Sequence, residues 1–295
     1  MSTPTLPPPS APPPRAPSGP AGPPSGATPL APPALPQRRS AAAWVLVGVG
    51  GVLAAALVAV GAQSVASAAV RHAEPGSAEL TGVSSVAVEL VRCGGEVEVT
   101  GDAPSGTATA TWSDRWSFSR PQHVRSVQDG LLTVRVTCSR LTWGWSPETD
   151  LDLSVPEGAE VSVRTSAGDV RAVGVGDAQL SSGVGDVVVR GARGELDLIT
   201  GAGSVVATGV DSPRIAASTG TVDVTLVTTT PPQSVSASSG VGDVLVEVPD
   251  DATGYALEVE TGVGSAHREV TENDSSGRLV MAMSGVGDVT VRPAG

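Results

Sequence analysis

Apolar and polar side chains alternate over most of the chain beyond residue 80, in short runs rich in valine, threonine and leucine. A period of two is typical of a β-strand with one buried face. Two clear runs are 222–226 and 244–248. The side chains predicted to point into a core are Val222, Val224, Leu226, Val244, Val246 and Val248. Those predicted to point outward are Asp223, Thr225, Leu245 and Glu247.

A glycine-rich turn separates these runs and recurs along the chain. SSGVGDV stands at 181–187 and again at 238–244, and SGVGDV stands at 284–289. The wider pattern, apolar-x-apolar-x-[ST]-G-x-G-D-V-x-V, occurs in seven copies, whose turns follow one another at intervals of 17, 18, 19, 20, 22 and 23 residues. VELVRCGGEVEV, with Cys93 in place of the first glycine and Glu96 in place of the aspartate, is a degenerate eighth copy. A period near twenty predicts an all-β fold, a β-solenoid with coils of about 17–23 residues.

The repeated turn is predicted to be structural. Glycine adopts positive φ without a Cβ penalty, and an aspartate carboxylate can accept hydrogen bonds from backbone N–H groups at the turn. The turn residues in the three best copies are Gly183, Gly185, Asp186, Gly240, Gly242, Asp243, Gly285, Gly287 and Asp288.

Calcium is an alternative reading of the same turns. GVGDV is similar to the GGxGxDxUx nonapeptide of calcium-binding β-rolls. The period here is about twice as long, and Ser204 and Ser265 replace the aspartate in two copies. The sequence therefore predicts no metal and no cofactor, with a calcium-binding module kept as an alternative.

The N-terminal part of the chain differs in composition from the rest. Residues 1–40 hold fifteen prolines and no acidic residue, which predicts a disordered arm that is either a spacer or a Pro-rich ligand. Residues 41–62 are uncharged and long enough to cross a membrane as a helix, and residues 63–79 form a linker. Arg38 and Arg39 precede the apolar run, so we expect the N-terminus in the cytoplasm and the C-terminal domain outside the cell.

A cleavable signal peptide is the alternative to an anchor, because SVASAAV at 64–70 offers small residues at a cleavage-like spacing. Both readings export everything beyond residue 70. In an oxidising compartment Cys93 and Cys138, the only two cysteines, are expected to form a disulfide. Two buried thiols or a metal pair are the alternatives.

Four of the five tryptophans lie between the cysteines or just after them, outside the regular repeats. The segment 111–125, TWSDRWSFSRPQHVR, is expected to be a projecting loop, and LTWGWSPETD to place two tryptophans on one face of a strand. The cluster is either an atypical terminal unit that covers the end of the core or an exposed patch for a protein or glycan. Its members are Trp112, Trp116, Trp143 and Trp145.

Charge and side-chain chemistry exclude several classes of function. The formal net charge is −12, so nucleic acid is not expected as a partner. The chain holds three well-separated histidines, no lysine and no GxSxG motif. We therefore expect no enzyme and no catalytic residues.

The repeats SAGDV, SSGVGDVVV, SSGVGDVLV and SGVGDVTV resemble those of a bacterial family of envelope β-strand-repeat domains labelled adhesins, a domain of unknown function. The resemblance covers roughly residues 80–292 and implies a β-solenoid at the cell surface. It supplies no catalytic residues. Within it, residues 80–160 would form an N-terminal part with the cysteine pair and the Trp-rich insert, and residues 161–292 the regular repeats.

Together these features predict a bacterial single-pass membrane protein. Its extracellular β-repeat domain would act, without catalysis, as an adhesion, scaffold or interaction surface. Alternatives are envelope-stress sensing through a ligand-binding ectodomain, and a calcium- or glycan-binding surface module. The exposed end strands also make self-association possible.

Overall fold

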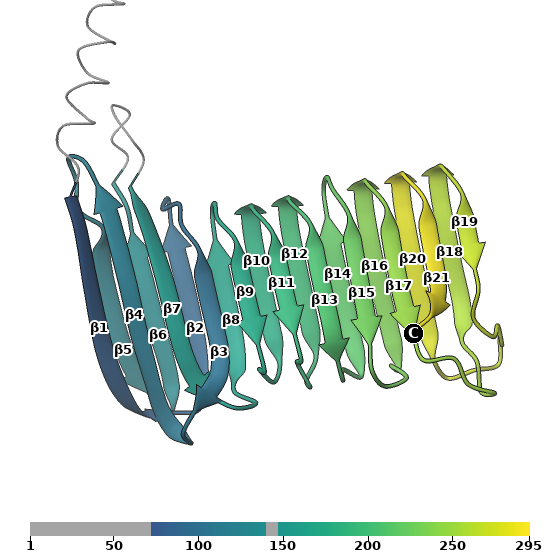
Figure 1. The fold of residues 1–295 in the computed structure, drawn as a ribbon, viewed down its shortest axis with the longest axis horizontal. Coiled ribbons are helices and arrows are strands. Elements are labelled where there is room, and N and C mark those ends of the chain that lie inside the picture. The colour runs from purple at the N-terminus through teal and green to yellow at the C-terminus, as the bar shows by residue number, and fades with distance from the viewer. Residues whose placement is uncertain (1–71, 140–146) are drawn as a thin grey trace, which may run out of the picture. The chain divides into compact units, whose positions relative to one another are not determined.

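The computed structural model describes residues 72–139 and 147–295, in which 21 strands form two sheets (Figure 1). The arm predicted at 1–40 and the membrane helix predicted at 41–62 lie outside these residues. Within the described part, no helix is long and apolar enough to cross a membrane. The fold is all-β and solenoid-like, as the alternating pattern predicts.

One sheet has eleven strands, which lie in the order β1-β4-β7-β3-β9-β11-β13-β15-β17-β21-β19. In that order their bounds are His72–Val83, Gly106–Trp116, Glu148–Pro156, Val97–Ala103, Val170–Val173, Val187–Arg190, Val205–Val210, Val224–Thr228, Val244–Val248, Val289–Pro293 and Ala266–Arg268.

The other sheet has ten strands, in the order β18-β20-β16-β14-β12-β10-β8-β2-β6-β5. In that order their bounds are Ala256–Val263, Leu279–Val286, Ser234–Val241, Arg214–Thr219, Leu196–Ala202, Ala178–Val184, Glu160–Thr165, Ser85–Val91, Leu131–Thr137 and Gln122–Gln128.

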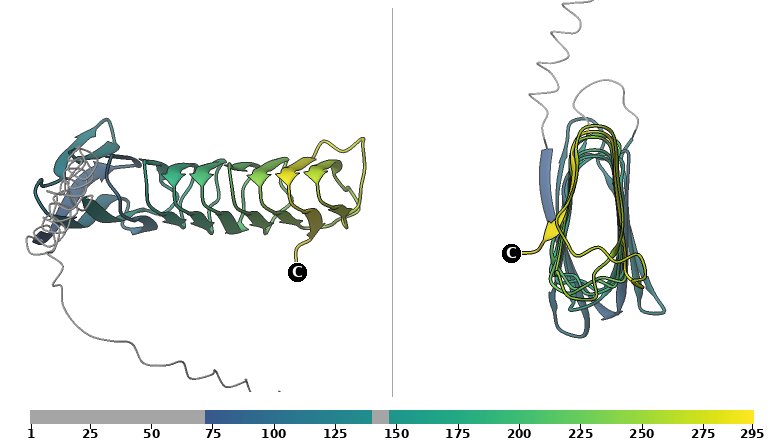
Figure 2. Two further views of the ribbon diagram at one scale, coloured as in Figure 1. Left: turned by 90° about the horizontal axis from the view of Figure 1, so that it is seen from above. Right: turned by 90° about the vertical axis from the view of Figure 1, so that its right-hand side faces the viewer.

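Each repeat forms one rung, which is a strand of the ten-stranded sheet, the glycine turn, and a strand of the eleven-stranded sheet. The rung β10–β11 pairs in parallel with the rung β12–β13, so that Leu180 lies beside Leu198 and Val189 beside Ala207. The two sheets therefore face each other across a narrow interior, as the right-hand view of Figure 2 shows. Equivalent residues of neighbouring rungs stack in columns.

The stacked columns form the core. Valines and alanines of the eleven-stranded sheet meet leucines, valines and alanines of the ten-stranded sheet, and small β-branched residues suit a column of like side chains spaced about 4.8 Å apart. Leu198, Val205, Val224, Leu226, Val235 and Val244 are completely buried. The predicted alternation is therefore confirmed at 224–226 and 244–248.

The prediction for Val222 is wrong. Its side chain is 45% exposed and its φ is 94°. Val222 occupies the place that the second glycine holds in the other turns, so it belongs to the turn and not to the strand β15. The alternating pattern assigned Val222 to the strand because its side chain is apolar, but the strand begins two residues later, at Val224.

The C-terminal rungs do not stack in the order of the sequence. The last rung, β20–β21, lies between the rungs β16–β17 and β18–β19 (Figure 1). Met283 of β20 accordingly lies beside Ser238 of β16 on one side and beside Glu260 of β18 on the other. After β17 the chain passes over the adjacent position and forms the rung β18–β19 one place further along. The rung β20–β21 then occupies the position between them.

The N-terminal end has extra strands beyond the regular rungs. β1 and β4 add to the eleven-stranded sheet and β5 to the ten-stranded sheet, all in antiparallel pairings. β1 begins at His72, so part of the segment 63–79 assigned as linker is a strand. The expected loop at 111–125 is wrong, because 111–116 belong to β4 and 122–125 to β5.

Candidate functional site

The glycine turns of successive rungs line up along one edge of the two sheets, which we call the turn edge. Its turns are residues 166–169, 183–186, 201–204, 220–223, 240–243, 262–265 and 285–288. The turns approach one another very closely there. A Cβ built on Gly285 would lie 2.5 Å from the carbonyl oxygen of Gly240 on the neighbouring rung. The first glycine of the motif is therefore required by packing between rungs.

The second glycine is required by its backbone conformation. Gly242 has a φ of 146° and Gly287 a φ of 145°, a region that is open to glycine and strained for other residues. Packing also excludes a side chain here, since a Cβ built on Gly287 would collide with the carbonyl oxygen of Gly242. The second glycine of GxG is thus required by both conformation and packing.

The hydroxyl residue before the first glycine joins neighbouring rungs. Ser284 Oγ donates a hydrogen bond of 2.8 Å to the carbonyl of Gly242, and Thr200 Oγ1 donates one of 2.7 Å to the carbonyl of Gly185. These side chains are buried, at 5% and 2% exposure. Each bond satisfies a turn carbonyl on the next rung, which explains why serine or threonine recurs at this position.

The aspartate after the second glycine forms a similar ladder. Asp243 Oδ1 accepts the backbone N–H of Asp288 at 2.8 Å, and Asp288 Oδ1 accepts that of Ser265 at 2.8 Å. The sequence led us to expect bonds within a turn, and the structure places them between rungs. Among the described residues, no group of three or more potential ligand side chains could hold a metal ion.

Exposed valines stand at the tips of the same turns. The variable residue of GxG is Val184, Val241, Val263 or Val286 in four copies, and these side chains are 58%, 53%, 65% and 47% exposed. Val286 lies in register with both Val241 and Val263. In the order of the stack Val263, Val286 and Val241 are consecutive, whereas Thr221 and Ala202 separate them from Val184. A row of three adjacent exposed valines therefore lies on the turn edge, beside the aspartate ladder. The repeated V in GVGD is visible in the sequence, but we did not predict an exposed valine there, because the pattern was interpreted as a structural turn or a calcium site.

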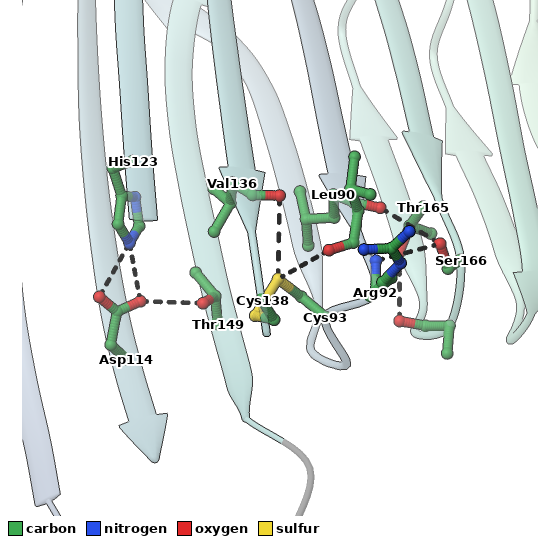
Figure 3. Close-up of a disulfide and its surroundings, with 12 residues drawn as sticks. Leu90, Arg92, Cys93, Asp114, His123, Val136, Cys138, Thr149, Thr165 and Ser166 are labelled. Carbon is green, nitrogen blue, oxygen red and sulfur yellow. Dashed lines mark hydrogen bonds and ion pairs between the residues drawn. A yellow bond between two sulfur atoms is a disulfide. The ribbon is translucent and has the colours of Figure 1, made fainter. Parts of the chain in front are cut away.

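The disulfide lies at the N-terminal end of the turn edge (Figure 3). Cys93 follows β2 and Cys138 follows β6, with their Cα atoms 5.2 Å apart and each side chain 1% exposed. The predicted disulfide is thus present, and it joins two adjacent rungs. No free cysteine occurs among the described residues.

A buried polar group lies between the terminal strands. Asp114 of β4, which is fully buried, accepts hydrogen bonds from Thr149 Oγ1 at 2.9 Å and contacts His123 Nε2 at 2.8 Å (Figure 3). A buried carboxylate is tolerated only when its oxygens are bonded in this way. No motif in the sequence marked these three residues, since they come from β4, β5 and β7.

The predicted aromatic patch is only partly within the described residues. Trp143 and Trp145 lie outside them. Trp112 and Trp116 are half-buried on the inner face of β4. The Trp112 ring lies over Gly76 of β1, where a Cβ would collide with it, and the Arg125 guanidinium lies 4.1 Å from the ring centroid.

Trp116 stacks on His72 with ring centroids 5.5 Å apart, and Arg120 lies over the same ring. Arg120 also pairs with Glu74 at 2.7 Å. Trp112 packs against the core, whereas the described contacts of Trp116 are with His72 and Arg120.

The other end of the stack is closed by Tyr255 and the segment 269–278. Tyr255 is fully buried, and its hydroxyl donates a 2.6 Å hydrogen bond to the carbonyl of Pro249. Burial raises the pKa of Tyr255. Arg278 bonds Asp251 at 2.8 Å, and this hydrogen bond lowers the pKa of Asp251.

These features define a β-solenoid of two-strand rungs, closed at both ends, with an exposed turn edge. The chain belongs to the Toastrack DUF4097 family, whose model matches residues 72–292. No curated protein matches the chain in sequence.

Three solved structures similar to the chain carry provisional names. A cell adhesion protein from Clostridium sporogenes shares 12% identity, with 75% of this chain and 100% of that chain covered and a TM-score of 0.34. An adhesin from Bacteroides fragilis shares 11%, covering 74% and 97%, with a TM-score of 0.38. A lipid-binding protein from Parabacteroides distasonis shares 9%, covering 73% and 96%, with a TM-score of 0.40.

Proposed function

We propose that this chain is a single-pass envelope protein whose β-solenoid is displayed outside the cell as a non-catalytic adhesion or scaffold surface. In this proposal residues 1–40 lie in the cytoplasm, residues 41–62 cross the membrane, and the solenoid follows. The apolar run, the two arginines before it and the disulfide support this topology.

The observation that carries the surface role is the row of adjacent exposed valines on the turn edge, with Val184 three rungs further along. Turn tips in water commonly hold polar residues, and a contiguous apolar strip on a soluble domain marks an interaction site. Here four valines at equivalent positions are 47–65% exposed. At a rung spacing of about 4.8 Å, Val263, Val286 and Val241 form one adjacent apolar row, and Val184 adds a separate apolar contact three rungs further along the edge.

The role is tested by exchanging the four valines for threonine, which keeps the branched shape and adds a hydroxyl. Val184, Val241, Val263 and Val286 are changed together in the full chain, and cells that display it are assayed for attachment to neighbouring cells and to glycan-coated surfaces. We expect attachment to fall about thirtyfold, since four apolar contacts of about 0.5 kcal/mol each contribute about 2 kcal/mol.

Val124→Thr is the matched control, because Val124 is 62% exposed on β5, away from the turn edge. It should leave attachment unchanged. Equal attachment by the fourfold variant and the parent chain, at equal display, contradicts the proposal. The topology is tested separately with a phosphatase fused after Gly295, which we expect to be active only outside the cytoplasm.

A further inference from the structure

The outer face of the ten-stranded sheet carries a long groove. One hollow of about 460 Å³ spans the first residues of β8, β10, β12, β14 and β16. A second hollow, of about 290 Å³, extends it over β2 and β6 and shares Glu160 and Ser162 with the first. The groove therefore runs across the strands, along the direction in which the rungs stack.

Four of the five side chains along the floor of the groove are short, and the fifth, Gln179, is longer. Residues in register across the five strands of the larger hollow point outward one behind another. They are Ser162, Gln179, Asp197, Ala216 and Ser236. Four steps between strands at about 4.8 Å give a floor about 19 Å long, which accommodates about six residues of an extended peptide.

The wall beside the floor is acidic. Glu160, Asp177 and Glu195 stand on three successive rungs, and Asp197 adds a fourth carboxylate on the floor. Arg214 pairs with Glu195 at 2.9 Å. Within residues 72–139 and 147–295, Glu160, Asp177 and Asp197 form no ion pair with a basic side chain. Asp177 Oδ1 accepts the backbone N–H of Glu195 at 2.7 Å, which leaves its second oxygen for a ligand. The carboxylates of Glu160 and Asp197, and one oxygen of Asp177, therefore face the groove without a basic partner among the described residues.

The shape and the charge favour one kind of occupant. We propose that this groove binds an extended, cationic polypeptide segment, with small residues along the floor and lysine or arginine side chains toward the acidic wall. None of the described residues that line it is aromatic, so the groove lacks the stacking platform that sugar rings use. The site is separate from the turn edge and does not rest on the proposed adhesion role.

The probe is a fluorescein-labelled peptide of five alternating Lys-Ala pairs, titrated with the full chain in non-ionic detergent at 0.15 M salt and followed by anisotropy. We expect saturable binding, and none by a peptide with serine in place of lysine. Glu160→Gln with Asp197→Asn should weaken binding on the order of tenfold, as two exposed charge contacts do.

Two further variants separate a groove from general charge attraction. Glu272→Gln with Asp274→Asn removes two exposed charges from the segment 269–278 and should leave affinity unchanged. Ala216→Trp fills the floor without changing charge and should weaken binding as strongly as the acidic pair. Thermal unfolding checks that each variant is folded.

The proposal is overturned by any of four results. The first is that the lysine peptide does not bind. The second is that the Glu272 and Asp274 variant loses as much affinity as the groove variant, and the third is that the Ala216→Trp variant binds normally. Binding of the serine peptide as strongly as the lysine peptide also overturns it, and would indicate a neutral ligand.

Discussion

The closest test of the rung packing is Gly285→Ala. Gly285 lies in the inserted rung, and its added Cβ would stand 2.5 Å from the carbonyl oxygen of Gly240. Ordinary contact for such atoms is about 3.5 Å, so the rungs must separate by roughly 1 Å. The obstacle is backbone on a neighbouring strand, which cannot rotate away as a side chain could.

The magnitude follows from the bonds that this separation stretches. Ser284 Oγ to the carbonyl of Gly242, Asp288 N–H to Asp243 Oδ1, and Gly242 N–H to the carbonyl of Val286 are each 2.8 Å long. At about 1 kcal/mol each, their loss costs about 3 kcal/mol. Alanine also reduces the conformational entropy of the unfolded chain, which stabilises the fold by about 0.4–1 kcal/mol. The net destabilisation is therefore about 2 kcal/mol.

The assay is urea unfolding followed by far-ultraviolet circular dichroism, with Gly277→Ala as the matched control. Gly277 has no atom within 4 Å of its built Cβ and no positive φ, so this variant should be as stable as the parent or slightly more. Equal unfolding midpoints for the two variants would refute the close packing of turns.

Three further predictions concern the ends of the stack. Replacing Cys93 and Cys138 by alanine opens a link across 45 residues and should lower the free energy of unfolding by about 4 kcal/mol, measured by urea unfolding without reductant. Tyr255→Phe removes the bond to Pro249 and should cost about 1 kcal/mol, measured in the same way; an unchanged midpoint would show that the bond adds nothing. Because Arg278 lowers the pKa of Asp251, this carboxylate adds stability above its unfolded pKa of about 4, and that stability is lost as the pH falls through the folded value. Asp251→Asn should therefore make the melting temperature less dependent on pH between about 5 and 2.5, and identical profiles would contradict this.

The repeat pattern in the sequence predicts the strands and the turn of a single rung. Alternation gives the buried column of Val244, Val246 and Val248, and each position of [ST]-G-x-G-D has its own role in the structure. The aspartate was expected to bond within its own turn, and it bonds the next rung. A single turn read alone cannot show this, because the partner is supplied only by stacking.

The sequence pattern does not predict which rungs lie next to one another. The repeats are alike, so their side chains fit beside any other copy, and nothing in SGVGDV at 284–289 states that it lies between two earlier copies. The long segment 269–278 before β20 is the one physical sign, since a chain that returns over a rung needs extra length. Likewise Asp114, His123 and Thr149 meet only because three distant strands join at one end.

The most direct measurement uses pairs of introduced cysteines. Neighbouring strands lie about 4.8 Å apart, within the reach of a disulfide, while strands two places apart lie near 10 Å, beyond it. Ser238 is in register with Met283, and Met283 is in register with Glu260. With β20 inserted, Ser238→Cys with Met283→Cys should oxidise to a disulfide seen by peptide mass, and Ser238→Cys with Glu260→Cys should not. Rapid cross-linking of the second pair, without the first, would show that the rungs stack in the order of the sequence and would contradict the account.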